Sequence, residues 1–204
     1  MNKEVFKMTY TPQNFDQLLG LKGFSDQLLQ NHFKLYQGYV ANTNKLMEIM
    51  MGMVKEGKAS TPEFAELKRR FGWEFNGMRL HELYFSNMVK SGTTVNKNSA
   101  FAQKLVEQMG SWENWENGFK AVGAMRGIGW VVLYYDPLGQ KFVNAWINEH
   151  DVGHLAGCAP VLIMDVFEHA FMLDYGLNRA DYIKAFFAAI NWKEVEKRFA
   201  MAEK

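Results

Sequence analysis

The sequence predicts an α+β fold, with an N-terminal α-helical hairpin followed by an α/β domain that contains a small three-stranded antiparallel sheet. Two observations support this prediction. Apolar residues recur at three- and four-residue spacing over residues 25–88, which is the period of amphipathic helices. From residue 130 onward, β-branched and aromatic residues flank the turn 136–139, which is typical of a strand hairpin. The polar stretch 91–96 lies between these regions, so we expect domains over residues 1–92 and 93–204.

The first domain is expected to hold two long helices. Ser25 offers an N-cap for a helix that runs to about Lys55, with a possible break near Asn42. Thr61-Pro62 supplies a cap and a proline at the first helical position, and it begins a second helix that continues to about Met88. Two long helices joined by a short connection form an antiparallel hairpin.

The second domain is expected to begin with helices, to continue as a sheet and to end in a helical tail. Its strands are rich in β-branched and aromatic residues, and a capping serine precedes its second helix. The remaining expected elements are a short helix over residues 12–19 after an extended lead-in, helices over 100–109 and 111–125, strands over 130–135, 141–146 and 161–165, and a helical tail over 179–201.

Composition narrows the class of protein. Apolar residues make up 48% of the 204 residues, which excludes disorder, and 23 basic against 22 acidic residues leave no charge pattern for nucleic acid. The single Cys158 has no partner for an internal disulfide, no apolar run reaches membrane length, and residues 1–10 lack the apolar core of a signal peptide. We therefore expect a soluble, cytoplasmic protein. The methionine-rich stretch 47–53 is interpreted as core filling and not as a copper site.

The stretch 161–175 contains the strongest chemical signal. Four apolar residues lead into Asp165, and Glu168-His169 follows one turn later. A buried charge without a partner costs several kcal/mol, so the carboxylate and the imidazole must be satisfied. A metal ion would satisfy both, and a hydrogen-bonded pair of core side chains would do so too.

Histidines elsewhere offer further ligands. The chain has five histidines: His32, His81, His150, His154 and His169. His32 lies seven residues before Tyr39, so the two share a helix face, and His81 lies on the apolar side of the second helix. A helical hairpin can bring these faces together.

Three C-terminal motifs occur in an informative order: DVFEHAF at 165–171, NRADY at 178–182 and INW at 190–192. Together they resemble the C-terminal signature of the iron/manganese superoxide dismutases. Segments 37–42 and 76–85 resemble this family's first and second helices, so the resemblance covers nearly the whole chain. It implies a metal-dependent disproportionation of superoxide to dioxygen and hydrogen peroxide.

The resemblance also implies a ligand set of His32, His81, Asp165 and His169 around one iron or manganese ion per chain, with water or hydroxide as a fifth ligand. Three nitrogens and one carboxylate suit these metals, whereas a structural zinc site favours cysteine, which is nearly absent. The Glu-x-x-His pairs of a di-iron bundle are missing.

Residues around this set receive roles by the same resemblance. Tyr39 would be the gateway proton donor, Trp130 and Phe167 would form an apolar wall, and Arg179 is expected close to the site. Glu168 would reach the partner subunit's His169 in a homodimer, with a tetramer as the alternative assembly.

The sequence departs from the family at the entrance. Phe167 replaces the usual tryptophan, Phe171-Met172 replaces a tyrosine pair, and the helix-one histidine beside the gateway tyrosine is Leu35 or Tyr36. These changes imply a remodelled entrance.

The residue that tunes the metal also differs from the usual pattern. Neither of the family's two usual places holds the glutamine that interacts with the metal-bound solvent. His154 lies eleven residues before Asp165, which resembles archaeal-type members where a histidine takes that role. We therefore expect His154 to donate a hydrogen bond to the bound solvent or Tyr39, and the choice of metal to be permissive.

The register of the first helix leads to a further prediction. Most family members place the ligand eight residues before the gateway tyrosine, and Asn31 occupies that position here. Seven residues of regular helix turn through about 700°, which leaves His32 and Tyr39 only about 20° apart. We expect a regular helix without a π-bulge, with His32 as the ligand. The alternative is that Asn31 takes the ligand position, which would leave a weakened three-ligand site.

Two other functions compete with this interpretation. His150 and His154, four residues apart, could belong to a zinc hydrolase, although no glutamate follows His150 as in the HExxH motif. A helical interaction protein that keeps the fold without redox activity is the other alternative.

Overall fold

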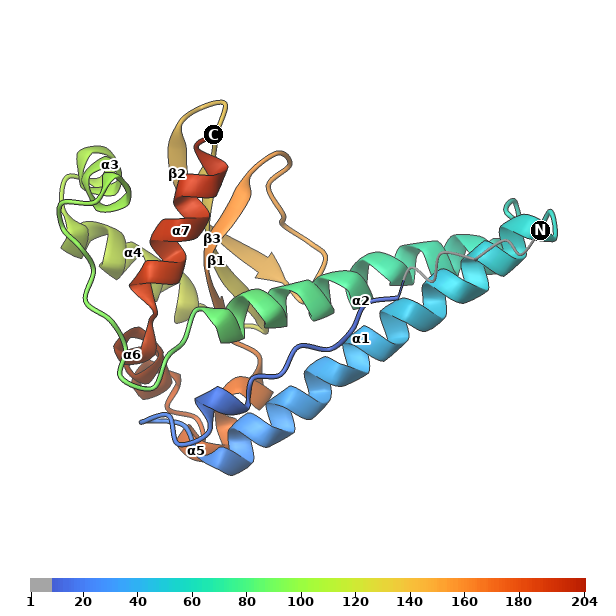
Figure 1. The fold of residues 1–204 in the computed structure, drawn as a ribbon, viewed down its shortest axis with the longest axis horizontal. Coiled ribbons are helices and arrows are strands. Elements are labelled where there is room, and N and C mark those ends of the chain that lie inside the picture. Colours follow the sequence, from blue (N-terminus) through green and yellow to red (C-terminus); the bar gives the residue numbers. More distant parts are fainter. Residues whose placement is uncertain (1–8) are drawn as a thin grey trace, which may run out of the picture.

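The structure is a computed structural model that describes residues 9–204; most of the predicted lead-in lies outside these residues. It has the predicted α+β architecture, a helical hairpin followed by an α/β domain with a three-stranded antiparallel sheet (Figure 1). The elements are η1 (Asp16–Leu18), α1 (Asp26–Lys55), α2 (Pro62–Ser86), α3 (Ala100–Met109), α4 (Trp112–Gly123), β1 (Gly129–Asp136), β2 (Lys141–Asn148), β3 (Ala159–Asp165), η2 (Glu168–Ala170), α5 (Met172–Tyr175), α6 (Arg179–Ala189) and α7 (Trp192–Ala202).

Local capping sets the start of both hairpin helices. The Ser25 hydroxyl accepts a hydrogen bond from the Leu28 amide, and the Thr61 hydroxyl accepts one from the Phe64 amide. Helix α1 continues through Asn42, so the possible break there is wrong. The Asn42 side chain instead donates across the hairpin to a carboxylate on α2, at 3.3 Å.

The sheet has the order β2-β1-β3, and β1 pairs antiparallel with both neighbours. Strand β1 is almost entirely buried because helices contact the sheet: α2 and α7 contact β3, and α4 contacts β1 and β2 (Figure 1). Trp130 pairs in register with Asp165, so the start of β1 and the end of β3 lie side by side. These two strand ends face the hairpin.

The predicted helical tail over residues 179–201 is confirmed, but it consists of two helices and not of one. The chain leaves helical geometry at Ile190 and Asn191, which separate α6 from α7. Ile190 forms an isolated antiparallel bridge with Met88, and the Asn191 amide donates to the Asn87 carbonyl at 2.6 Å. Because the end of α2 satisfies these backbone groups, the helix can break at little cost.

A largely buried arginine, with 10% of its side chain exposed, joins the C-terminal helix to the hairpin. The Arg198 guanidinium donates to the Asn87 side-chain oxygen at 2.6 Å and to the Leu83 carbonyl at 3.0 Å. A charge at this depth is stable only when its donors are satisfied, so α7 is fixed against the end of α2.

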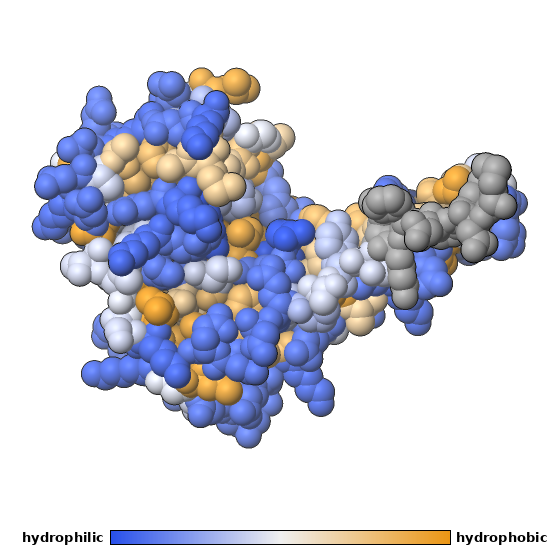
Figure 2. All heavy atoms as spheres, viewed as in Figure 1, coloured by the Kyte–Doolittle hydropathy of each residue, from blue (hydrophilic) through white to orange (hydrophobic). Residues whose placement is uncertain are grey.

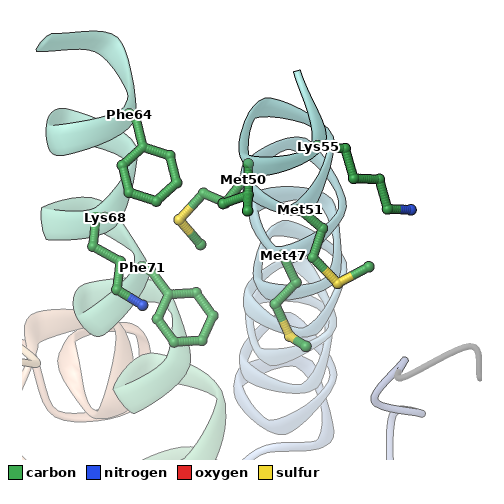
Figure 3. Close-up of a pocket in the computed structure, with 8 residues that line it drawn as sticks. Met47, Met50, Met51, Lys55, Phe64, Lys68 and Phe71 are labelled. Atoms are coloured by element: carbon green, nitrogen blue, oxygen red, sulfur yellow. The ribbon is translucent and has the colours of Figure 1, made fainter. Parts of the chain in front are cut away.

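Side chains leave a groove at the end of the hairpin where α1 ends and α2 begins. Met50, Phe64 and Phe71 line a groove of about 470 Å³ between α1 and α2 (Figure 3). Met50 is buried, as the core-filling interpretation expects, while Met51 at the rim is exposed. The face in Figure 2 is largely hydrophilic with small apolar patches. Among residues 9–204, no helix has the length and apolar character needed to span a membrane.

Candidate metal centre

Four elements bring the predicted ligand set together. Helix α1 supplies His32, α2 supplies His81, β3 ends on Asp165, and the short η2 turn supplies His169. The potential ligand atoms of these four residues all lie within 4.8 Å of one another. The Asp165 Oδ2 atom is 3.2 Å from Nε2 of His32, 3.2 Å from Nε2 of His169 and 3.7 Å from Nε2 of His81. Residues 9–204 contain no second cluster of this kind.

The protonation state of His81 is fixed by a hydrogen bond to a backbone carbonyl. Its Nδ1 atom is hydrogen-bonded to the Gly77 carbonyl, which can only accept, so Nδ1 carries the proton. The Nε2 atom therefore presents a lone pair, and it is buried without a hydrogen-bond partner among the described residues. A buried lone pair that faces a carboxylate fits a cation between them, and a carbonyl on the other ring nitrogen is the usual support for a metal-binding histidine.

The electrostatics of the cluster favour the charge states that bind metal. Burial lowers the pKa of His32 and, together with the nearby His32, lowers that of His81 much further, so both imidazoles stay neutral. Burial alone would raise the pKa of Asp165, but His169 and His32 outweigh it and hold that pKa well below its usual range. The Phe167 amide also donates to Asp165 Oδ1 at 2.8 Å.

The register of α1 agrees with the prediction of a regular helix. Every residue from Asp26 to Lys55 is α-helical, so His32 and Tyr39 project from the same side. Asn31 lies on the exposed side and accepts a hydrogen bond from the Gln27 side chain at 2.9 Å. It is His32, and not Asn31, that lies in the cluster.

The predicted hydrogen bond between His154 and Tyr39 is wrong. His154 Nε2 donates to the His150 carbonyl at 2.8 Å, and its Nδ1 accepts from the Tyr134 hydroxyl at 2.8 Å. His150 contacts Tyr39 instead, with Nε2 2.9 Å from the tyrosine hydroxyl. The reason is a turn after β2 that directs His150 inward and His154 toward β1.

The tautomer of His150 follows from its second contact. The Trp130 indole N–H donates to His150 Nδ1 at 3.0 Å, so Nδ1 is the acceptor and Nε2 carries the proton. His150 Nε2–H therefore donates to the Tyr39 oxygen. Burial lowers the pKa of His150 to about 4, which keeps the ring neutral, and burial raises the pKa of Tyr39, which keeps its hydroxyl protonated.

The remaining predicted residues differ in their contacts with the metal-ligand histidines. Phe167 stacks on His169 with ring centroids 5.2 Å apart, and Trp130 meets His81 edge to face at 4.9 Å. The Arg179 guanidinium donates to the Met125 and Gly127 carbonyls in the loop after α4 and lies 5.2 Å from the Phe171 ring centre, so a role for Arg179 beside the metal stays a prediction.

Glu168 is exposed beside His169, whose side chain is 29% exposed. The two residues border a groove of about 260 Å³, lined also by Leu28, Asn31, Met172 and Leu173. His169 is thus the one member of the ligand set that solvent reaches in the isolated chain.

Sequence reasoning missed two neighbours of Tyr39. The first is His150, for which the signal was its position one turn before His154. The second is Gly77, where a Cβ atom would lie only 2.7 Å from Cδ1 of Tyr39. A glycine four residues before a histidine on an otherwise bulky helix was the available signal for this close approach.

Comparison with known proteins agrees with this geometry. A family model described as iron/manganese superoxide dismutases, C-terminal domain, matches residues 97–198. The superoxide dismutase [Fe] of Aquifex pyrophilus is 35% identical over 198 residues, which cover 95% of this chain and 89% of the relative. The superoxide dismutase [Mn] 1 of Haloferax volcanii is 33% identical over 179 residues (87% and 88%), and the superoxide dismutase [Fe] of Saccharolobus solfataricus is 34% identical over 167 residues (80% and 79%). The chain belongs to the iron/manganese superoxide dismutase family.

Proposed function

We propose that this chain is a superoxide dismutase that converts superoxide to dioxygen and hydrogen peroxide with one iron or manganese ion. His32, His81, Asp165 and His169 would hold the ion. The observation that carries the proposal is the buried carboxylate surrounded by three imidazoles, one of which presents an unpartnered lone pair. Three neutral nitrogens and one carboxylate form a donor set that suits these metals.

The two competing functions find less support. His150 and His154 each use both ring nitrogens in hydrogen bonds within the protein, so neither offers a free ligand atom for a zinc hydrolase. A family member without redox chemistry would not need to keep three histidines around one buried aspartate, because burying such a set is costly.

The chemistry divides between the metal and the chain. When bound, the metal would take an electron from one superoxide and give an electron to a second. The residues supply protons and exclude water. His150 Nε2–H donates to the Tyr39 oxygen, so the hydroxyl proton of Tyr39 remains available as a donor on the side of the cluster, where its ring stacks on His81. We assign proton delivery to Tyr39 and His150, in place of the expected His154.

The ligand assignment is tested by removing single imidazoles. His81→Ala and His169→Ala should each lose metal and activity, measured as metal content and superoxide consumption on the same purified sample. Asn31→Ala and His32→Ala form a matched pair on α1, in which only the second should lose metal. A His32→Ala protein that retains full metal and activity would refute the assignment.

We also propose a homodimer in which Glu168 accepts a hydrogen bond from the partner subunit's His169, with a tetramer as a possible further assembly. Three observations support this: the exposed carboxylate, the partly exposed metal-ligand histidine, and the exposed Met172 and Leu173 beside them. Sedimentation should give a dimer that Glu168→Ala weakens. A fully active monomer at low concentration would contradict the proposal.

Three finer points complete the proposal. We propose a cytoplasmic location, and a division into domains over residues 1–92 and 93–204. We also propose a permissive metal choice, because the two places where the family carries its glutamine hold Gly77 and the run Asn148-Glu149-His150, with no glutamine at either. Activity with only one of the two metals, when each is fully loaded, would count against permissiveness.

A further inference from the structure

Trp73 covers the outer side of the two residues assigned to proton delivery. Its indole ring lies 4.5 Å from the His150 ring, edge to face, and 5.5 Å from the Tyr39 ring. His150 is fully buried and Tyr39 is only 8% exposed, whereas Trp73 itself is half-buried. The indole therefore stands between this pair and solvent.

A hydrogen bond fixes one edge of the indole. The Trp73 Nε1–H group donates to the Glu149 carboxylate at 2.9 Å. Glu149 directly precedes His150 and has a φ of 52°, in the left-handed region that non-glycine residues rarely occupy. With this backbone geometry, consecutive side chains from the loop after β2 contact the same indole: Glu149 at its N–H and His150 at its ring.

A cation fixes one face of the indole. The Arg70 guanidinium carbon lies 3.9 Å from the Trp73 ring centre. The guanidinium is itself held by two hydrogen bonds to the buried Glu74 carboxylate, at 2.7 and 2.9 Å, and Asn42 on α1 donates to the other oxygen of Glu74. Because both N–H groups converge on the Glu74 Oε1 atom, the guanidinium is restricted in orientation and stays against the indole.

We propose that Trp73 is a positioning residue that keeps water away from the Tyr39–His150 hydrogen bond, and that Glu149 and Arg70 clamp it in place. The proposal rests on the proposed function. Water admitted at this point would compete for the His150 N–H and for the Tyr39 oxygen, so the proton donor would lose its fixed orientation. Delivery of protons would slow, while the first encounter with superoxide would change little.

The test compares two tryptophans in the metal-loaded protein. Trp112 is a matched control, because its indole N–H also donates to a glutamate, at 3.1 Å, and its ring packs against Phe101, Trp115 and Trp192, not against the metal cluster. Trp73→Ala should lower kcat by about tenfold and change kcat/KM by less than about twofold, whereas Trp112→Ala should leave both near their original values.

The second readout does not depend on turnover. Second-derivative ultraviolet absorption reports the exposure of tyrosines, and subtracting the spectrum of a Tyr39→Phe protein isolates Tyr39. The Tyr39 signal should become that of a solvent-exposed tyrosine in Trp73→Ala. It should remain that of a buried tyrosine in Trp112→Ala. Unchanged metal content in the Trp73 variant separates this result from a failure of the ligand assignment.

Glu149 tests the clamp with less risk to folding. Glu149→Gln keeps an oxygen that can accept the indole hydrogen bond and should behave as the original protein. Glu149→Ala should shift both readouts in the direction of Trp73→Ala. The proposal is overturned if Tyr39 stays buried and kcat is unchanged in Trp73→Ala or, where that variant does not fold, in Glu149→Ala.

Discussion

A single methyl group at residue 77 should disturb the active site without touching a metal ligand. In Gly77→Ala, the added Cβ would lie 2.7 Å from Cδ1 and 2.9 Å from Cε1 of Tyr39. Ordinary carbon contacts lie at about 3.5–4.0 Å, so the ring must retreat by about 1 Å. Tyr39 has little freedom to do so, because its ring stacks on His81 and its hydroxyl bonds His150.

The change in the free energy of unfolding of Gly77→Ala is the sum of opposing contributions. Alanine favours the helix over glycine by about 1 kcal/mol. Overpacking costs about 1–3 kcal/mol, and moving the hydroxyl from 2.9 Å to beyond about 3.6 Å from His150 loses a hydrogen bond worth about 1 kcal/mol. Gly77→Ala should therefore lower the free energy of unfolding by roughly 1–3 kcal/mol. It should lower kcat by about tenfold, since the proton donor is displaced.

Gly72 provides the control on the same helix. A Cβ at residue 72 meets no atom within 4 Å, so Gly72→Ala should gain about 1 kcal/mol of stability and keep full activity. Urea unfolding and superoxide turnover of the two metal-loaded variants measure both effects. If Gly77→Ala proves as stable and as active as Gly72→Ala, the close packing of Tyr39 on α2 is not what orients the donor.

Further variants test acid sensitivity, the C-terminal clamp and the first helix cap. Burial lowers the pKa of His150 from 6.5 to about 4, so between pH 4 and pH 6.5 the unfolded chain binds a proton at this ring and the folded chain does not. The free energy of unfolding should therefore fall by about 3 kcal/mol as the pH drops from 7 to 4. In a series of urea-unfolding measurements over this pH range, His150→Gln should show a smaller fall. Arg198→Met leaves the Asn87 side-chain oxygen without its donor and should cost about 2–4 kcal/mol in urea unfolding, whereas the exposed neighbour Lys197→Met should change stability by less than about 0.5 kcal/mol. Ser25→Ala removes the cap of α1 and should lower the thermal midpoint by an amount equivalent to about 1 kcal/mol.

Helix starts and strand positions could be predicted because their signals are local. Ser25 and Thr61 cap the amides three residues ahead of them, so a short stretch of sequence contains both partners of each interaction. The third strand was expected to begin at residue 161 and begins at Ala159, while its end at Asp165 is as predicted. Strand pairing adds residues at an end when the neighbouring strand is longer, and here β1 offers partners as far as Tyr135.

The break between α6 and α7 could not be predicted in the same way. The helical pattern continues through residues 179–201, and no proline interrupts it. What ends α6 is pairing with Met88 and Asn87, about a hundred residues earlier in the chain. A local pattern carries no information about such a partner, so tertiary contacts override it.

Tertiary contacts also explain why His150, and not the predicted His154, bonds Tyr39. The same case shows why the metal ligands were easier to predict than the residues around them. Two histidines four apart share a face only in a helix, yet these lie in a turn. Val152 pairs back onto Asn148, and Gly153 has a φ of 108° at a point where a Cβ would lie 2.6 Å from the Trp146 carbonyl oxygen.

That reversal sends the two rings in different directions, and His154 closes the turn by donating to the His150 carbonyl. Trp130, twenty residues earlier on β1, then decides which nitrogen of His150 faces Tyr39. Helical spacing therefore sufficed to align His32 with Tyr39 along α1. The direction of the hydrogen bond to the proton donor, by contrast, is set jointly by a strand, a turn and a helix that are far apart in the sequence.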